Sequence, residues 1–380
     1  MERISIIRKK IINSFTITLI AASIVLYMLI LNYSYGSRTI EKMIDEVQGK
    51  DLFTYFFQTS NHFYFAEENN PFSAMHLTDL FFSLAANVKP TDARSYLINQ
   101  IPGLADYDTE ILVAGEGTNI TNLPVEPHLT ETEQKNESPV AEEKVKTTSD
   151  TAPPAAKKTY TLAESDIFIY QSHNRESFLP FLKGTNDPDK ASSSDQRANV
   201  VKIGSLLAEQ LIANGLKVYH DTTDVNKKLV ERNMNYYHSY DISGEIVKAA
   251  SAQNTKMQYF IDVHRDAARK KLTTKVINGK SYARLYFIIG KENKDYQKNL
   301  EFTKKINSAL EEKYPGLSRG VLGKSRLEGN GVYNQNISDK AILVELGGVD
   351  NTMDELNRTI KALADAYTAA YNHSIAVNKQ

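Results

Sequence analysis

The stretch YFIDVHRD, residues 259–266, decides the fold that we expect for this chain of 380 residues. It is an apolar run, rich in aromatic and β-branched residues, that ends in a histidine flanked by charged residues. This pattern predicts a buried strand that delivers an imidazole, that of His264, to the rim of a sheet.

Two further stretches end in a comparable way. The run DIFIY (166–170) leads into His173 and Glu176, and the run AILV (341–344) leads into Glu345. Three predicted strands therefore each end in a side chain that could bind a metal ion or act as a general base.

From Leu162 onward, segments with the patterns of strands and of helices alternate. The predicted strands are 166–170, 216–219, 259–266, 282–289 and 341–345, and the predicted helices are 199–213, 241–252, 295–313 and 352–371. Thr352 and Glu355 fit a capping box at the start of the last helix. The alternation implies an α/β fold with a largely parallel sheet, right-handed crossovers and helices on both faces.

The composition narrows the kinds of site that the chain can carry. A formal net charge of -1 gives no reason to expect nucleic-acid binding. The chain has no cysteine, which excludes disulfides, cysteine-based zinc sites and thiol nucleophiles. Histidine, aspartate and glutamate remain as the expected metal ligands.

A long and largely apolar run, residues 11–31, follows a short basic segment at the start of the chain. Its length matches the roughly 20 residues that span a bilayer as a helix. The basic residues before it predict that residues 1–10 are cytoplasmic and that a single-pass anchor holds the rest outside the cell membrane. A cleaved signal peptide, with a site near 34–36, is the alternative, but the apolar run is long for it.

Two segments of different composition separate this run from the first predicted strand. Residues 37–123 are dense in aromatic residues, which predicts a small extracytoplasmic juxtamembrane region of short amphipathic helices. Residues 124–160 have few large apolar side chains to offset the entropy of ordering, so they should form a flexible linker. The catalytic domain is then expected at 161–375.

In open parallel sheets, functional sites lie beyond the carboxyl ends of the strands, so the predicted strand ends would meet at one rim. We expect His173, Glu176 and His264 to bind Zn²⁺, with Glu345 as the general base. Asp195 is the alternative to Glu176 as the third ligand, because a carboxylate just before a helix start can face this rim.

The other candidates are weaker. His220 and Asp221 also follow a predicted strand, and His238 lies in an aromatic segment that could line a substrate groove. Structural or inert roles are expected for His238 and for the remaining histidines, which are His62, His76, His128 and His373. A structural salt bridge is the expected role of Arg265 and Asp266. No His-Glu-x-x-His motif is present, which excludes the helix-borne metalloprotease site.

Three segments together resemble the signature segments of the stage II sporulation protein P family. They are YQSHNRESF (170–178), DVHRD (262–266) and LVELGG (343–348). The predicted anchor and linker ahead of the catalytic region fit the same layout. The resemblance implies a membrane-anchored peptidoglycan hydrolase that acts during engulfment in sporulation. Such a protein is an N-acetylmuramoyl-L-alanine amidase that also cuts peptide crosslinks.

The resemblance also implies a zinc-dependent amidase-like catalytic domain, in which histidines and a carboxylate hold the metal and a late glutamate is catalytic. His173, His264 and Glu345 match such positions. Related amidases place the carboxylate ligand four residues before an asparagine, which here favours Asp195 before Asn199. The partners that the resemblance implies are the stage II sporulation proteins D and M.

Two other functions stay open at this point. The first is an endopeptidase that acts mainly on the peptide crosslinks of the cell wall. The second is a non-catalytic wall-binding scaffold whose rim has lost its metal.

Overall fold

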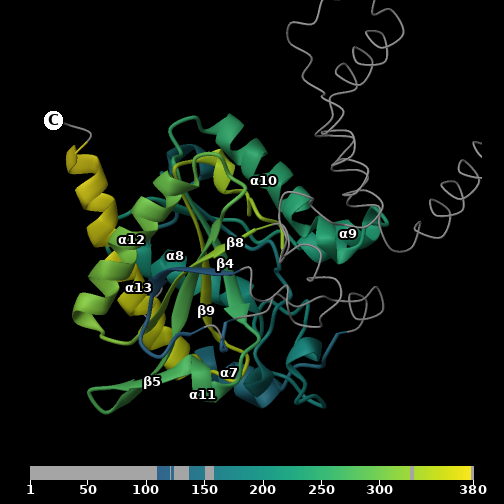
Figure 1. The fold of residues 1–380 in the computed structure, drawn as a ribbon. Coiled ribbons are helices and arrows are strands. Elements are labelled where there is room, and N and C mark those ends of the chain that lie inside the picture. The colour runs from purple at the N-terminus through teal and green to yellow at the C-terminus, as the bar shows by residue number, and fades with distance from the viewer. Residues whose placement is uncertain (1–108, 120, 124–136, 150–157, 326–328, 378–380) are drawn as a thin grey trace, which may run out of the picture. The chain divides into compact units, whose positions relative to one another are not determined.

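The computed structural model describes residues 109–119, 121–123, 137–149, 158–325 and 329–377, which Figure 1 draws as a coloured ribbon. The predicted anchor at 11–31 lies outside these residues, as does the predicted juxtamembrane region before residue 109. Among the residues that the structure describes, no helix is long and apolar enough to cross a bilayer.

A seven-stranded sheet forms the centre of the described structure, with the strand order β1-β8-β7-β9-β4-β2-β3. Its strands are β1 (Glu110–Ala114), β2 (Ile167–Tyr170), β3 (Val218–His220), β4 (Tyr259–Asp266), β7 (Leu285–Gly290), β8 (Ser318–Lys324) and β9 (Lys340–Gly348). Four of the six neighbouring pairs are parallel: β2–β3, β2–β4, β4–β9 and β7–β8. The pairs β7–β9 and β1–β8 are antiparallel. The predicted α/β fold with a mostly parallel sheet is confirmed, although the sheet is mixed.

The segment predicted as one strand at 282–289 is divided in the structure. Its first residues belong to β6 (Lys280–Ala283), which pairs with β5 (Thr274–Ile277) in a separate antiparallel hairpin. The rest belongs to β7, which is antiparallel to β9 rather than parallel to it. The prediction was wrong here because apolar content indicates burial but carries no information on strand direction.

The sequence patterns do not predict β8 or its edge neighbour β1. β8 has the sequence SRGVLGK, in which charged residues and two glycines obscure a strand that is buried along its whole length. Gly320 has a φ of 107°, and a side chain there would meet the carbonyl oxygen of Val113 in β1. Glycine is therefore needed for the close approach of these two strands.

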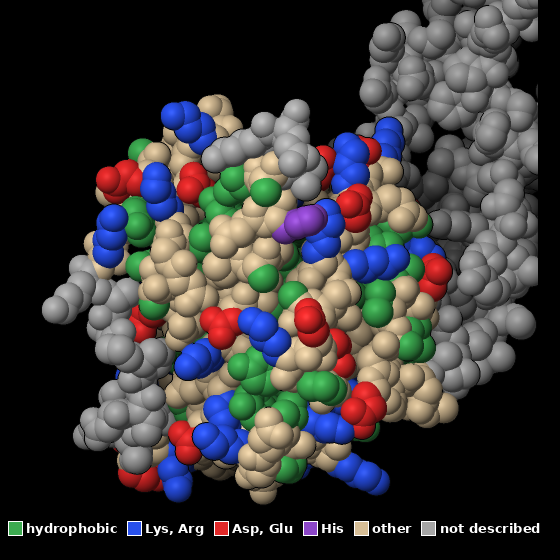
Figure 2. Space-filling model, turned by 90° about the vertical axis from the view of Figure 1, so that its left-hand side faces the viewer, with side chains coloured by type: hydrophobic (Ala, Val, Ile, Leu, Met, Phe, Trp, Pro, Cys, Tyr) green, Lys and Arg blue, Asp and Glu red, His purple; other side chains and the backbone are tan. Residues whose placement is uncertain are grey.

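Helices cover both faces of the sheet (Figure 1). The main core lies under α8 (Val200–Ala213), α12 (Tyr296–Lys313) and α13 (Met353–Val377), and Ile167 and Ile169 of β2 belong to it. The alternate residues Phe168 and Tyr170 pack against α10 (Ser239–Gln253) on the opposite face. On the side that carries α12 and α13, acidic and basic side chains are interspersed (Figure 2), as the small net charge suggests.

Local capping fixes the starts of two of these helices. The Asn199 side chain accepts a hydrogen bond of 2.9 Å from the Val201 N–H at the start of α8. The carboxylate of Glu355 accepts one of 2.9 Å from the Thr352 N–H, and the Thr352 hydroxyl accepts one of 3.4 Å from the Glu355 N–H, which confirms the predicted capping box. These contacts satisfy N–H groups that have no partner within the helix.

Residues 137–149, inside the predicted flexible linker, are packed on the domain. Val140 forms a β-bridge with Leu182, the Ala141 N–H donates to the Phe181 carbonyl at 2.8 Å, and α7 (Glu142–Ser149) follows. Val145 is 3% exposed and belongs to the main core. The prediction was wrong for this part. It was based on the polar composition of the whole segment, and a few apolar residues such as Val140 and Val145 are enough to pack on the domain without changing that composition.

We expect a fragment of residues 105–380 to be more stable than one that begins at the predicted boundary, 161. The shorter fragment lacks β1 and α7, so it exposes the edge of β8 and the surface under Val145. Full burial of one such apolar side chain stabilises by about 1.5–3 kcal/mol. Urea unfolding followed by circular dichroism should give a lower midpoint for the shorter fragment. A fragment starting at 137 separates the two contributions, and equal midpoints for all three would contradict the packing described here.

Candidate metal centre

The carboxyl ends of β2, β4 and β9 lie side by side, because these strands are parallel neighbours. His264 is in the last part of β4, and Glu345 is its directly paired neighbour on β9. His173 and Glu176 lie in the loop that follows β2. The predicted convergence of these four residues on one rim is therefore what the structure shows.

The carboxylate of Glu176 lies between two imidazoles. Its Oε1 is 3.2 Å from His173 Nδ1, and its Oε2 is 3.6 Å from His264 Nδ1. The candidate ligand atoms of the three residues all lie within 4.8 Å of one another. His173, Glu176 and His264 are 4%, 7% and 1% exposed. This group, which we call the His-Glu-His cluster, is therefore compact and almost completely shielded from solvent.

The electrostatics of the cluster favour a positive charge at its centre. Burial alone would raise the pKa of Glu176, but the neighbouring His264 and His173 lower it well below its ordinary value. Burial would likewise lower the pKa of His264, whereas Asp262 and Glu176 raise it well above its ordinary value. A metal cation could take the place of the proton that these carboxylates otherwise hold on the imidazole.

Glu345 differs from Glu176 in its surroundings. Burial raises its pKa to about 8, with Glu176 and Asp266 adding to the effect and His264 opposing it. Its buried Oε2 has no hydrogen-bond partner among the described residues. A buried carboxyl oxygen without a partner is costly in a structural position and typical of a functional one.

The donor set fits zinc. Two imidazoles and one carboxylate are a common protein ligand set for a catalytic zinc ion, and such sites leave a further position for water or substrate. The unpartnered Oε2 of Glu345, on the strand next to His264, is a buried polar atom that a water or substrate group at such a site could satisfy. His173, Glu176 and His264 are therefore the residues that could hold the metal.

Tyrosine side chains surround the cluster on the α10 face. Tyr236, from the short 3-10 helix η6 (Tyr236–His238), has its ring centroid 4.6 Å from that of His173. Tyr240 of α10 lies 5.1 Å from His173 and 6.2 Å from His264, measured between ring centroids. The predicted aromatic segment thus borders the site, while His238 pairs with Asp241 at 2.7 Å and lies outside the cluster.

Tyr286 is a residue of the site that the sequence pattern does not reveal. It pairs with Glu345 across β7 and β9, as His264 does across β4 and β9, so the three side chains form a row on one face of the sheet. Its phenol is buried, and burial together with Asp266 and Glu345 raises its pKa well above the ordinary value. Only the antiparallel direction of β7, which the sequence does not reveal, brings it here.

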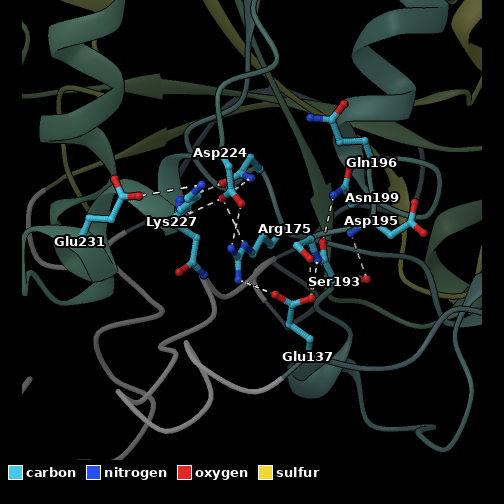
Figure 3. A network of polar contacts seen from close by, with 12 residues as sticks. Glu137, Arg175, Ser193, Asp195, Gln196, Asn199, Asp224, Lys227 and Glu231 are labelled. Carbon is cyan, nitrogen blue, oxygen red and sulfur yellow. Dashed lines mark hydrogen bonds and ion pairs between the residues drawn. The ribbon is translucent and has the colours of Figure 1, made fainter.

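Asp195 does not join the cluster. Its carboxylate is bound by Arg197 at 2.6 Å, and Arg197 also binds Glu142 of α7. Figure 3 shows Asp195 on the far side of Ser193 from the residues that hold the His173–Glu176 loop. Of the two carboxylates that the sequence left open as the third ligand, the structure brings Glu176 to the histidines.

The charged residues next to the cluster ligands are used as anchors. Arg175 donates to both oxygens of Asp224 and also binds Glu137 at 2.7 Å (Figure 3). Asp224 in turn caps the start of α9 (Val225–Glu231). Arg265 donates to three backbone carbonyls, those of Ser177, Pro188 and Ala191. The salt bridge expected for Asp266 exists, with Arg319 of β8 as its partner. Arg265 has no salt bridge among the residues that the structure describes, because its acceptors there are carbonyls.

Comparisons with known proteins agree with the three segments that the sequence analysis singled out. Residues 91–368 match the family described as Stage II sporulation protein P. The chain belongs to this family. Stage II sporulation protein P of Bacillus subtilis (strain 168) is 42% identical over 337 residues, which cover 88% of this chain and 83% of the relative. The resemblance inferred from the sequence is thus confirmed.

Two solved structures resemble the described fold at low sequence identity. One is an N-acetylmuramoyl-L-alanine amidase from Clostridium difficile 630, with 17% identity, a TM-score of 0.34, and coverage of 57% of this chain and 97% of the amidase. The other is Cwp6 from Clostridium difficile, with 14% identity, a TM-score of 0.32, and coverage of 55% of this chain and 29% of Cwp6.

We expect the purified protein to bind about one zinc ion per chain through the His-Glu-His cluster. Replacing His173 or His264 by alanine should abolish stoichiometric zinc, because each change removes a ligand from a buried set of three. Metal analysis by mass spectrometry after dialysis measures this. Asp195→Ala is the control and should retain zinc; loss of zinc in that variant with retention in His264→Ala would contradict the assignment.

His220 lies apart from the cluster and gives a pH-dependent stability. Its Nε2 is 2.9 Å from Gln171 Nε2, and burial lowers its pKa to about 4. At a pH between about 4 and the ordinary pKa of about 6.5, His220 is protonated in the unfolded chain but not in the folded chain. The contribution of His220 to stability should therefore fall as the pH is lowered through this range, by about 2–2.5 kcal/mol between pH 7 and pH 4.5. Urea unfolding at pH 7 and 4.5 should show a smaller loss for His220→Gln than for the wild type.

Proposed function

We propose that this protein is a zinc-dependent peptidoglycan hydrolase, an N-acetylmuramoyl-L-alanine amidase that acts on the cell wall during engulfment in sporulation. The observation that carries the proposal is the buried His-Glu-His cluster with Glu345 beside it on the neighbouring strand. Membership of the stage II sporulation protein P family supports the biological setting.

His173, Glu176 and His264 would hold the metal. A bound zinc ion would supply Lewis acidity, which polarises the scissile carbonyl and acidifies water. The remaining steps belong to side chains of the chain itself. The aromatic rings of Tyr236 and Tyr240 pack against the imidazoles, which holds the ligands in place and limits access of bulk water.

Glu345 would move the proton. It accepts a proton from the water that attacks the amide between the lactyl group and L-alanine, and it donates that proton to the departing amine. Its pKa of about 8 suits the second step, since a carboxyl with a raised pKa is a good proton donor near neutral pH. A nearby dication would lower this pKa and so favour the ionised form that the first step requires.

We also propose that residues 11–31 anchor the protein in the cell membrane with the catalytic domain outside. A tether ahead of the domain would let it reach peptidoglycan at some distance from the bilayer. Stage II sporulation proteins D and M are the proposed partners. Membrane fractionation of cells that produce the full chain and a variant lacking residues 1–35 tests the anchor, and co-purification after crosslinking tests the partners.

Glu345→Gln should lower the turnover of peptidoglycan by about 10²–10⁴-fold while zinc is retained, because it removes the proton acceptor but no ligand. Digests of purified cell wall analysed by mass spectrometry measure this loss and identify the bond that is cut. An amidase frees intact stem peptides from intact glycan, whereas an endopeptidase cuts within or between the stems.

The same assay separates the proposal from its alternatives. His264→Ala should lose both zinc and activity, and Asp195→Ala should keep both. Products from crosslinks alone would replace the amidase assignment by an endopeptidase. A wild-type protein without zinc and without lytic activity would leave a wall-binding scaffold as the function.

A further inference from the structure

Asp262 is a buried carboxylate on β4 that the proposed mechanism does not use. It is 0% exposed and lies two residues before His264, on the same face of the strand. Its Oδ1 accepts a hydrogen bond of 2.9 Å from the Ser172 N–H, and its Oδ2 accepts one of 2.5 Å from the Ser172 hydroxyl. Its Oδ1 also lies 3.0 Å from His264 Nε2.

A carboxylate at such depth requires a positive or strongly donating partner, because the loss of its hydration is costly. Ser172 supplies two neutral donors, and His264 is the basic side chain in contact with Asp262. The contact between Nε2 and Oδ1 is an ion pair when the imidazole is protonated. Nε2 has no other polar partner among the described residues.

The other ring nitrogen of His264 faces the cluster. Its Nδ1 is 3.6 Å from Glu176 Oε2, while His173 Nδ1 is 3.2 Å from Glu176 Oε1. Both Nδ1 atoms thus point to one carboxylate. The geometry places an acid on each side of the His264 ring, with Asp262 at Nε2 and Glu176 at Nδ1.

We propose that Asp262 is a positioning residue that keeps the proton of His264 on Nε2 and leaves Nδ1 as the ligand atom for the metal. Histidine ligands are generally oriented in this way by an acceptor at the second ring nitrogen, which fixes the tautomer and strengthens the metal–nitrogen bond. This role rests on the zinc site of the proposed function, and it adds a residue that contacts a metal ligand but not the metal itself.

Asp262 is itself held in place by a buried polar chain. The Ser172 hydroxyl lies 2.7 Å from that of Ser243 in α10, which accepts a hydrogen bond of 3.0 Å from the Asn334 side chain. Asn334 has a φ of 55°, a conformation uncommon for residues other than glycine. The chain links β2, β4, α10 and the loop before β9, so the carboxylate cannot turn away without breaking several contacts.

A rival arrangement is Asp262 as a direct ligand, with Nε2 rather than Nδ1 of His264 on the metal. The two arrangements predict opposite tautomers. If Asp262 positions the ring, the zinc-loaded protein has its proton on Nε2; if Asp262 binds the metal, the proton is on Nδ1. Long-range ¹H–¹⁵N correlation spectra of the full chain labelled with ¹⁵N-histidine distinguish the two, with His264→Ala identifying the signal.

The second measurement is zinc affinity by competition with a chromophoric chelator. Asp262→Asn keeps the shape of the side chain and removes its charge, so affinity should fall about 10–100-fold. Ser172→Ala should give a smaller loss, because it removes one hydrogen bond to Asp262 but not the carboxylate. Asp266→Asn is the matched control: it also removes a buried carboxylate from β4, whose partner is Arg319, and should lower thermal stability while zinc affinity stays close to the wild type.

The outcomes separate this inference from the proposed function. Stoichiometric zinc in the wild type, an Nε2–H tautomer at His264 and weaker binding in Asp262→Asn support it. An Nδ1–H tautomer, or unchanged affinity in a folded Asp262→Asn, overturns the inference alone. A wild-type protein that binds no zinc overturns the proposed function and the positioning role together. The tautomer is measured on the wild type, so this part of the test does not depend on whether Asp262→Asn folds.

Discussion

Parallel pairing of β2, β4 and β9 is the constraint on which the rest of the site depends. It places the ends of three strands at one edge of the sheet and sets His264 directly opposite Glu345. The two cluster residues outside these strands, His173 and Glu176, follow β2 within a few residues, so the loop that joins them to the sheet is short. The cluster is thereby formed at the paired central strands of the sheet, and sites built on strands or helices are positioned more precisely than sites on loops.

The loop that carries His173 and Glu176 needs its own support, because it makes no strand pairing beyond isolated bridges. Arg175 and Arg265 provide it from two sides. The first joins the loop to the cap of α9 through Asp224, and the second binds three carbonyls of the segment that follows. Arginine suits both positions, because its fixed fork of donors can satisfy several acceptors at once. Glu137, which lies between β1 and β2 in the chain, adds an ion pair to Arg175. The arrangement of the loop therefore also depends on a residue far away in sequence.

Much of the fold and part of the site could be predicted from the sequence. His173, His264 and Glu345 could be predicted because each follows an apolar run, and such a run can be recognised in the sequence without knowledge of the tertiary structure. The choice between Glu176 and Asp195 could not be made, since it depends on a loop turn and on Arg197, which captures Asp195 in a surface ion pair. Tyr286 was missed for a different reason: its approach to Glu345 depends on the direction of β7, and an apolar run is the same in either direction. β8 was missed because its glycines and charged residues interrupt the apolar pattern of a buried strand. In the structure, Gly320 allows the close approach of β1 and Arg319 pairs with Asp266.

The buried acids of this rim also explain why the site should hold a cation. Asp266 is paired with Arg319. Burial raises the pKa of Glu345 to about 8, so this carboxyl is mostly protonated near neutral pH. Glu176 and Asp262 remain, and both lie against the imidazole of His264, one at each ring nitrogen. Glu176 also contacts His173 and accepts from the Arg265 N–H, and Asp262 also accepts two hydrogen bonds from Ser172. A divalent cation at Nδ1 would compensate Glu176 directly, while the proton left on Nε2 would still serve Asp262. The arrangement of charges is therefore compatible with the zinc ion that we propose, for which two imidazoles and one carboxylate are a common ligand set.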